Sequence, residues 1–377
     1  MTEKTVYEHL REGGLSRRDF MKFCGLLSGM MGLEFLPPIK AFGAAAGRSP
    51  AELVADALKS KPRLPLIWLE LQDCAGCTEA ISRSRSPSLV NLVLNKISVD
   101  YQETLMAAAG VQAEEAKRAA MEKYRGQYIL VVEGSPSIGA NGAYCTIGGR
   151  SGLEILRKAA DGAAAIIATG NCAAFGGLPK AAPNPTDARG VSEIITDRPI
   201  VNIPGCPAIP EVTTGTIAHF LVMGALPQTD ALKRPLTFYG HTVHDHCLRR
   251  PFHDAGKFAG GFDDGGARAG HCLYKLGCKG PTTYNACSSL KWEQGLSFPV
   301  QSGHPCLGCS EPRFWDGGGF YQGQSAPLDP PTAAAVGIAA GAGIALGAAL
   351  AGANAAGKRK AAKAVSAEPG GKPGLGG

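Results

Sequence analysis

The twelve cysteines of this 377-residue chain constrain its fold more than any other feature of the sequence. Half of them lie between residues 233 and 324, where glycine, proline, aromatic and polar residues follow one another with little periodicity. Such a segment cannot easily build a hydrophobic core of its own. We therefore predict that covalent or inorganic cross-links hold it together. The six cysteines concerned are Cys247, Cys272, Cys278, Cys287, Cys306 and Cys309.

The preceding part of the chain, from residue 64 to about residue 226, alternates apolar runs with helical patterns. This alternation is typical of a parallel sheet covered by helices on both faces, which is a doubly wound α/β fold. The apolar runs predict strands at 64–71, 128–133, 164–169 and 200–203. Helical periodicity predicts helices at 88–95, 112–124, 151–160 and 211–223.

Four more cysteines directly follow predicted strands. Cys74 and Cys77 come after the first of these strands, Cys172 after the third and Cys206 after the fourth. Ligands of an open α/β sheet bind in the crevice at the carboxyl ends of its strands, so four thiols far apart in the sequence are expected to converge there. Converging thiolates indicate a metal site.

The first 46 residues resemble a twin-arginine export signal. The motif Ser16-Arg17-Arg18-Asp19-Phe20 precedes an apolar stretch that reaches Phe35, and Ala44-Ala45-Ala46 offers small residues for cleavage. We therefore expect a signal peptide over residues 1–46 and export of a chain that is already folded. The alternative is a basic turn followed by a short buried helix.

The C-terminal region has the composition of a membrane anchor. Residues 330–357 are 28 residues without a charge, and Lys358-Arg359-Lys360 follows. A helix needs about 20 residues to cross the hydrocarbon core of a bilayer, and basic clusters favour the cytoplasmic side. We predict a transmembrane helix over 330–357 and a basic cytoplasmic tail over 358–377. A low-complexity linker is the alternative, because most of these residues are alanine and glycine.

The length of the chain predicts its number of folded units. A chain of 377 residues exceeds what one hydrophobic core usually fills, so two folded units are expected.

The location of the charge argues against nucleic-acid binding. Residues 1–50 carry seven Lys and Arg against five Asp and Glu, and residues 332–377 carry five against one. The formal charge of +6 therefore lies at the two ends and leaves a neutral body. A neutral body without a basic stripe offers no binding surface for nucleic acid.

Disulfides, zinc and iron-sulfur clusters are the possible cross-links. Export favours disulfides, but eleven cysteines remain without Cys24 of the signal, and an odd number cannot all pair within one chain. Zinc ribbons need neighbouring Cys-x-x-Cys pairs, whereas the pairs Cys74-Cys77 and Cys306-Cys309 lie more than 200 residues apart. Iron-sulfur clusters accept scattered thiolates and an occasional histidine ligand, and the motif His244-Asp245-His246-Cys247 offers both.

These motifs resemble the small, electron-transferring subunit of nickel-iron hydrogenases, from Arg17 to the C-terminal anchor. Glu133-Gly134-Ser135, residues 202–207 and His304-Pro305-Cys306 also look like the family's motifs. The resemblance implies two 4Fe-4S clusters and one 3Fe-4S cluster, with ligands assigned by position. The proximal 4Fe-4S cluster takes Cys74, Cys77, Cys172 and Cys206; the distal 4Fe-4S cluster takes His244, Cys247, Cys272 and Cys278; the medial 3Fe-4S cluster takes Cys287, Cys306 and Cys309.

Three other positions refine the resemblance. Pro299 stands where the family keeps a non-ligand in place of a fourth thiolate, which agrees with a three-iron medial cluster. Oxygen-tolerant members carry two additional cysteines around the proximal cluster, and the matching positions here are Gly76 and Gly177. The resemblance therefore implies an oxygen-sensitive enzyme with an ordinary proximal cluster. Cys145 remains without an assigned ligand role, and we interpret it as a buried small residue.

The resemblance also implies the organisation and partners of the chain. A flavodoxin-like domain with the proximal cluster is expected at 47–232, and a loop-rich iron-sulfur domain with the medial and distal clusters at 233–329. The enzyme would be a nickel-iron uptake hydrogenase on the periplasmic side of the cytoplasmic membrane. Hydrogen would be split at a nickel-iron centre in a partner large subunit. This chain, without catalytic residues of its own, would pass electrons to a cytochrome b or another integral membrane subunit that reduces quinone.

Two other functions remain possible from the residues. A doubly wound sheet also suits a flavin-binding redox protein, although Cys74 and Cys77 occupy the place where a phosphate-binding loop would follow the first strand. A disulfide-stapled exported binding protein is the second alternative. Iron and acid-labile sulfide would indicate the hydrogenase subunit. Yellow fluorescence would indicate a flavin, and a colourless protein would indicate disulfides.

Overall fold

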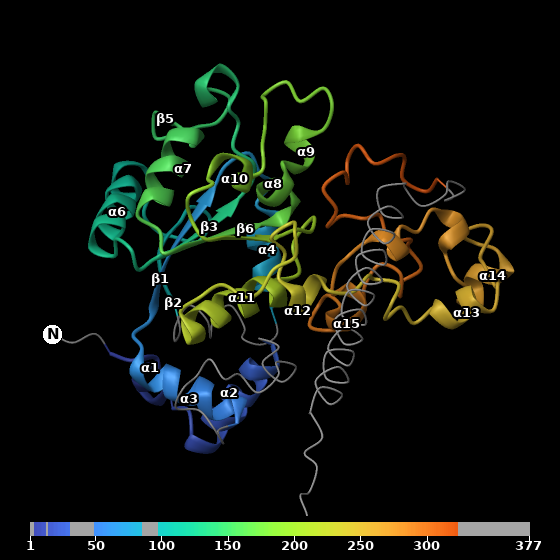
Figure 1. Ribbon diagram of the computed structural model, residues 1–377, viewed down its shortest axis with the longest axis horizontal. Helices are drawn as coiled ribbons and strands as arrows, with labels where there is room; N and C mark the ends of the chain where they lie inside the picture. The colour runs from blue at the N-terminus through green and yellow to red at the C-terminus, as the bar shows by residue number, and fades with distance from the viewer. Residues whose placement is uncertain (1–3, 13, 31–48, 85–96, 323–377) are drawn as a thin grey trace, which may run out of the picture. The chain divides into compact units, whose positions relative to one another are not determined.

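A computed structural model describes residues 4–12, 14–30, 49–84 and 97–322 of the chain (Figure 1). The helix predicted at 88–95 lies outside these described residues, and so do the membrane helix predicted at 330–357 and the basic tail. Within the described part, no helix is both long and apolar enough to cross a membrane.

A five-stranded parallel sheet forms the N-terminal part of the structure, which confirms the predicted doubly wound α/β class. Its strands lie in the order β2-β1-β3-β6-β7, the 2-1-3-4-5 order of flavodoxin-like sheets. The order reverses between β1 and β3, so the ligand crevice of this sheet is expected at their carboxyl ends. The strands are β1 Leu64–Glu70, β2 Ile97–Gln102, β3 Ile129–Glu133, β6 Ala165–Thr169 and β7 Ile200–Ile203.

Four of these strands agree with the predicted ranges to within one residue at each end, whereas β2 was not predicted. The strand β2 lies at the edge of the sheet and pairs only with β1. Its sequence Ile-Ser-Val-Asp-Tyr-Gln alternates apolar and polar residues because an edge strand is not buried on both faces. A search for continuous apolar runs therefore passes over it.

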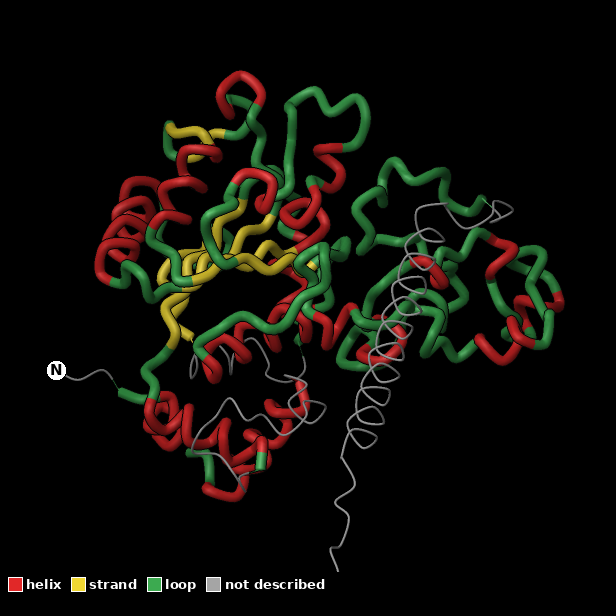
Figure 2. The backbone as a smooth tube through the Cα atoms, viewed as in Figure 1, coloured by secondary structure: helices red, strands yellow, loops and turns green. Residues whose placement is uncertain are grey.

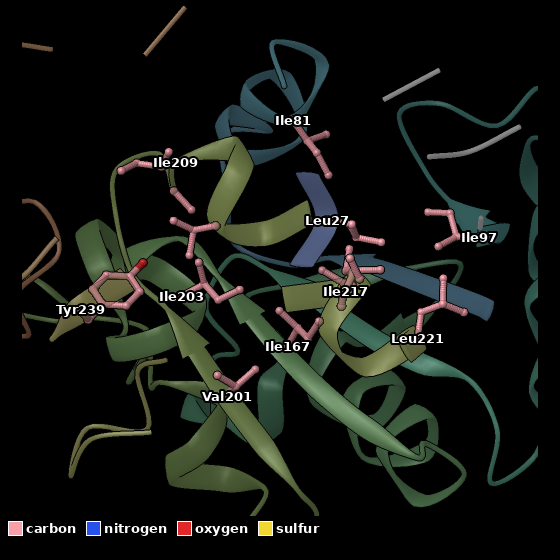
Figure 3. Close-up of a cluster of buried hydrophobic side chains, with 14 of the residues drawn as sticks. Leu27, Ile81, Ile97, Ile167, Val201, Ile203, Ile209, Ile217, Leu221 and Tyr239 are labelled. Carbon is pink, nitrogen blue, oxygen red and sulfur yellow. The ribbon is translucent and has the colours of Figure 1, made fainter. Parts of the chain in front are cut away.

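Helices cover both faces of the sheet, as Figure 2 shows. On one face, Ile67, Leu130 and Ile166 pack with Ile155 and Leu156 of α7 (Gly152–Asp161). Alternate residues of the same strands point to the other face, where α11 (Pro210–Met223) lies. Figure 3 shows that second core, with Ile167, Val201 and Ile203 of the sheet facing Ile217 and Leu221 of α11. The period of two along each strand decides which core a residue joins.

The export-signal region is partly described and folds as helices. Arg17 and Arg18 are exposed at the start of α2 (Arg17–Met30), while Phe20, Cys24 and Leu27 are buried on one side of that helix. This side packs against α3 (Pro50–Ser60), whose start is capped by Ser49 and Glu52. The spacing of the apolar residues, four and three apart, gives α2 a single apolar stripe.

Between α11 and residue 322, where the description ends, the chain contains only short helical turns joined by loops, as its composition predicted. The first of these turns is α12 Leu236–Tyr239. Short helices also lie around the sheet: α4 Gly76–Ser82, which carries Cys77, α8 Gly170–Phe175, which carries Cys172, and α9 Gly177–Lys180. The other described elements are α1 Val6–Glu12, α6 Gly110–Lys123, η2 Gly139–Gly142, β4 Thr146–Ile147, β5 Arg150–Ser151, α10 Val191–Ile194, α13 Arg250–Asp254, α14 Gly265–Arg268, η3 Tyr274–Leu276, η4 Gly280–Thr282 and α15 Cys287–Leu290.

Truncating the sheet's core should destabilise the fold. Ile167 in β6 is fully buried between the sheet and α11, so Ile167→Ala should lower the free energy of unfolding by about 2–5 kcal/mol through lost burial and a cavity. Val111→Ala on α6, where the side chain is 73% exposed, should change it by less than about 0.5 kcal/mol. Denaturant unfolding of both variants measures the difference; equal midpoints would contradict the packing.

Candidate metal centres

Cys74, Cys77, Cys172 and Cys206 converge at the carboxyl edge of the sheet. Cys74 and Cys77 flank the start of α4 after β1, Cys172 lies in α8 after β6, and Cys206 lies in the loop after β7. Cys172 and Cys206 lie close enough to Cys77 to raise the pKa of that thiol. Cys74 in turn lies close enough to raise the pKa values of Cys172 and Cys206. The structure thus brings together the four residues that the sequence predicted to meet.

Two glycines make room for this group of thiols. A Cβ atom on Gly170 would lie 2.5 Å from the sulfur of Cys77, and a Cβ atom on Gly177 would lie 2.5 Å from the sulfur of Cys172. Both glycines also have positive φ angles, +83° and +52°, which other residues rarely adopt. Any side chain at either position would displace a thiol of the group.

The carboxylate of Glu133 holds the start of α4 in place from a neighbouring strand. Helix α4 begins after Ala75, which has no capping side chain. Glu133, at the end of β3 and 2% exposed, accepts instead from the backbone N–H groups of Cys77 at 2.8 Å and Thr78 at 2.9 Å. These are N–H groups of a first helical turn, which lack partners within the helix. The position of Cys77 therefore depends on a residue 56 positions away.

A buried polar network extends from Glu133 to the edge of the sheet. The hydroxyl oxygen of Thr78 lies 2.7 Å from a carboxylate oxygen of Glu133 and 3.0 Å from one of Glu70, and its single proton serves one of them at a time. Gln102 and Thr104 donate to Glu70 at 2.9 Å and 2.8 Å. Burial raises the pKa of Glu133, and the hydrogen bonds from Thr78 and Cys77 oppose that shift.

The second group of predicted ligands lines one small cavity. His244, Cys247, Cys272 and Cys278 all border it, together with Arg249 and Tyr274. Burial raises the pKa of each of the three thiols. Burial lowers the pKa of His244, which favours the neutral imidazole that binds metals. The ring of His253 lies 4.6 Å from the ring of His244, centroid to centroid.

The third group consists of Cys287 at the start of α15 and Cys306 and Cys309 in a later loop. Gly308, with φ of +82°, lets this loop turn back so that Cys306 and Cys309 lie near each other and near Cys287. Burial raises the pKa of each of these three thiols to about 12. Pro299 is exposed, whereas none of these three thiols is.

The chemistry of these donors suits metal clusters. All twelve cysteines lie in the described part of the chain, and all are free thiols there. Burying an isolated thiolate is costly, and the raised pKa values express that cost. A bound metal ion supplies the positive charge that deprotonates such thiols. Neutral histidine and buried thiols around a common space therefore fit iron-sulfur clusters.

Two histidines and one cysteine lie apart from the three groups, and two polar residues near the first group were not predicted from the sequence. His241 and His246 are exposed and contact each other. Cys145 was predicted to be buried, but it is half-buried against the core on the α7 face of the sheet. The roles of Thr78 and Gln102 could not be predicted, because their partners come from other strands and no local motif marks them.

Comparisons with known proteins agree with this architecture. The family model of the NADH ubiquinone oxidoreductase 20 kDa subunit matches residues 74–220. The model of the C-terminal part of the NiFe/NiFeSe hydrogenase small subunit matches residues 239–322. The first match ends within α11, and the second covers most of the loop-rich segment that follows.

Relatives cover most of the chain. It is 48% identical over 319 residues to the uptake hydrogenase small subunit of Azotobacter vinelandii, covering 85% of this chain and 86% of the relative. It is 49% identical over 319 residues to the hydrogenase-1 small chain of Citrobacter freundii, covering 85% and 82%. A chain of the reduced, active Ni-Fe-Se hydrogenase of Desulfomicrobium baculatum superposes with a TM-score of 0.66 at 32% identity, covering 70% of this chain and 100% of that chain.

A parallel α/β sheet with thiols at its carboxyl edge, followed by a cysteine-rich segment with little core, defines an electron-transfer protein of the iron-sulfur class. The chain belongs to the nickel-iron hydrogenase small subunits, and it is the electron-transfer small subunit of an uptake hydrogenase.

Removing one acceptor oxygen from the buried network should be costly. In Glu133→Gln an NH₂ group replaces an oxygen that accepts from Cys77 or Thr78, so a buried donor loses its partner, and the free energy of unfolding should fall by about 1–3 kcal/mol. Glu122→Gln, at an exposed position of α6, is the matched control and should be nearly neutral. Denaturant unfolding compares the two; a neutral Glu133→Gln would show that this carboxylate does not hold α4.

Proposed function

We propose that ten cysteines and His244 hold three iron-sulfur clusters, two of the 4Fe-4S type and one of the 3Fe-4S type. Cys74, Cys77, Cys172 and Cys206 form the proximal site; His244, Cys247, Cys272 and Cys278 form the distal site; Cys287, Cys306 and Cys309 form the medial site. The observation that carries the proposal is that these three groups include every cysteine except Cys24 in α2 and Cys145.

The numbers of donors support the cluster types. A 4Fe-4S cluster is held by four protein ligands, and a histidine replaces a cysteine in some iron-sulfur centres. Two of the groups have four donors, whereas the medial group has three. Pro299, at the position where a fourth medial thiolate would be expected, is exposed and carries no donor.

Electrons would enter this chain at the proximal cluster and leave at the distal cluster. Hydrogen oxidation yields two electrons and two protons at the nickel-iron centre of the partner large subunit. This subunit accepts the electrons one at a time and passes them from the proximal to the medial and then to the distal cluster. The potential of each cluster depends on its charge, its burial and the hydrogen bonds to its sulfurs. The protein tunes electron flow through the packing around its thiols.

The proximal cluster would be of the ordinary, oxygen-sensitive kind. Gly76 and Gly177 occupy the two positions at which oxygen-tolerant members of the family carry additional cysteines. A Cβ atom on Gly177 would lie 2.5 Å from the sulfur of Cys172, and one on Gly76 would lie 3.1 Å from the sulfur of Cys74. A side chain at Gly177 would displace Cys172, and one at Gly76 would make a tight contact with Cys74, which supports a proximal site with four cysteines.

The location of the enzyme follows from the ends of the chain. A twin-arginine signal over 1–46, with Arg17 and Arg18 exposed, would direct export of the folded protein. Residues 47–232 would form the flavodoxin-like domain and residues 233–329 the iron-sulfur domain. A transmembrane helix over 330–357 and a cytoplasmic tail over 358–377 would anchor the body on the periplasmic face. A cytochrome b or another membrane subunit that reduces quinone would accept the electrons there.

Metal analysis tests the cluster assignment. The purified enzyme should be brown and should contain acid-labile sulfide and about eleven irons for this subunit, besides the iron of the large subunit. In Cys272→Ala the iron content should fall and the distal signal in electron paramagnetic resonance should be lost or altered, while Cys145→Ala should keep the full content. A colourless protein with its thiols paired as disulfides, or a Cys145→Ala variant that loses a cluster, would overturn the assignment.

Replacing the histidine ligand tests whether electrons reach the acceptor through the distal cluster. A neutral imidazole leaves the distal site less negative than a thiolate does, so His244→Cys should lower the potential of the distal cluster. Hydrogen activation in the large subunit, measured by hydrogen-deuterium exchange, should be preserved, while turnover with the physiological acceptor changes. His219→Gln on α11, away from the proposed ligands in the sequence, is the control and should leave turnover with that acceptor unchanged. Unchanged turnover of His244→Cys with that acceptor would remove the role given to His244.

A further inference from the structure

Asn171 connects the proximal and medial groups of thiols. It precedes Cys172 in α8 and is 2% exposed. Its backbone N–H donates to the carbonyl oxygen of Gly205 at 2.7 Å, next to the proximal Cys206. Its side-chain NH₂ donates to the carbonyl oxygens of Cys309 and Glu311, both at 3.0 Å. Carbonyl oxygens only accept hydrogen bonds, so the orientation of the carboxamide is fixed by its partners.

The two loops that Asn171 joins are also held from their other sides. Tyr239, 1% exposed, donates its hydroxyl proton to the carbonyl oxygen of Pro204 at 2.7 Å. The side chain of Arg234 donates to Glu311 at 3.2 Å, and the same carboxylate oxygen accepts from the backbone N–H of Tyr284 at 2.7 Å. Asn171 therefore bridges two anchored segments, and its loss would open the space between them.

Asn171 lies beside a direct contact between two proposed ligands of different clusters. The backbone N–H of Cys206 lies close enough to the sulfur of Cys309 to lower the pKa of that thiol against the effect of burial. A similar contact joins the medial and distal groups, where the backbone N–H of Cys306 donates to the sulfur of Cys278 at 3.3 Å. In both places a peptide group of one ligand residue meets the sulfur of a ligand in the adjacent group.

We propose that Asn171 is a positioning residue for electron transfer, whose carboxamide keeps the sulfur of Cys309 against the peptide N–H of Cys206. An N–H group that donates to a ligand sulfur stabilises the more negative, reduced cluster and raises its potential. The same contact supplies a short path from the proximal to the medial cluster. This inference rests on the proposed function, because it needs Cys206 and Cys309 to bind neighbouring clusters.

The test is the midpoint potential of the medial cluster in the purified complex with the large subunit, followed by electron paramagnetic resonance during a redox titration. Asn171→Ala removes both donations to the medial loop. The equilibrium constant for one-electron reduction of the medial cluster should fall by about tenfold, which is a shift of about 59 mV to lower potential. Electron transfer from the proximal to the medial cluster should also become slower.

The chain offers a matched control in Asn202. Asn202 is also 2% exposed, its NH₂ also donates to a backbone carbonyl, that of Leu232 at 2.9 Å, and its side-chain oxygen, like that of Asn171, finds no partner among the described residues. Asn202→Ala should cost similar stability and leave the medial potential unchanged. Asn171→Ser, which keeps one donor, should give a smaller shift than Asn171→Ala and decides the test if the alanine variant does not retain its clusters.

The outcomes distinguish failure of the positioning role from failure of the proposed function. A medial potential that is unchanged in the Asn171 variants, or shifted equally in Asn202→Ala, would overturn the positioning role while leaving the clusters in place. A wild-type protein without iron or without a medial signal would instead overturn the proposed function.

Discussion

Parallel strands end together at one edge of their sheet, and the remainder of this structure depends on that constraint. The register of β1, β3, β6 and β7 places Glu70, Glu133, Thr169 and Ile203 in one row at the carboxyl edge. Every loop that leaves this row enters the same crevice, so cysteines separated by more than 130 residues in the sequence lie close together. The hydrophobic cores on the two faces of the sheet hold this edge, and the core on the α11 face includes the thiols of Cys278 and Cys287.

Thiols and buried carboxylates determine what the structure can do. Burial raises the pKa of Cys172 to about 11 and the pKa values of Cys287, Cys306 and Cys309 to about 12. Loss of hydration and the charges of Glu133 and Glu70 also raise the pKa of Asp73, beside Cys74, to about 7. An environment that disfavours uncompensated negative charge is suited to a metal cluster, whose own charge replaces the missing protons.

The contacts between the three groups link structure to electron transfer. Peptide N–H groups of Cys206 and Cys306 lie beside the sulfurs of Cys309 and Cys278, so the backbone of one group reaches a thiol of the next. Asn171 adds hydrogen bonds to the loop that carries Cys309. The loop-rich segment after α11 keeps its geometry through such hydrogen bonds and through buried residues, among them Leu273, Phe298 and Val300, that join the core on the α11 face.

The sequence by itself determined the parallel α/β class, four of the five main strands and the set of cysteines, because apolar runs and strand-end cysteines are local signals. It also determined that Cys74 and Cys77 would share an edge with Cys172 and Cys206. Only the tertiary structure decided that Glu133 caps α4, that the polar alternation of β2 belongs to an edge strand, and that Asn171 joins two loops. These features depend on partners 33 to 140 residues away, from Leu64 beside Ile97 to Asn171 beside Glu311, and side-chain contacts across a sheet leave no periodic pattern in the sequence around either partner.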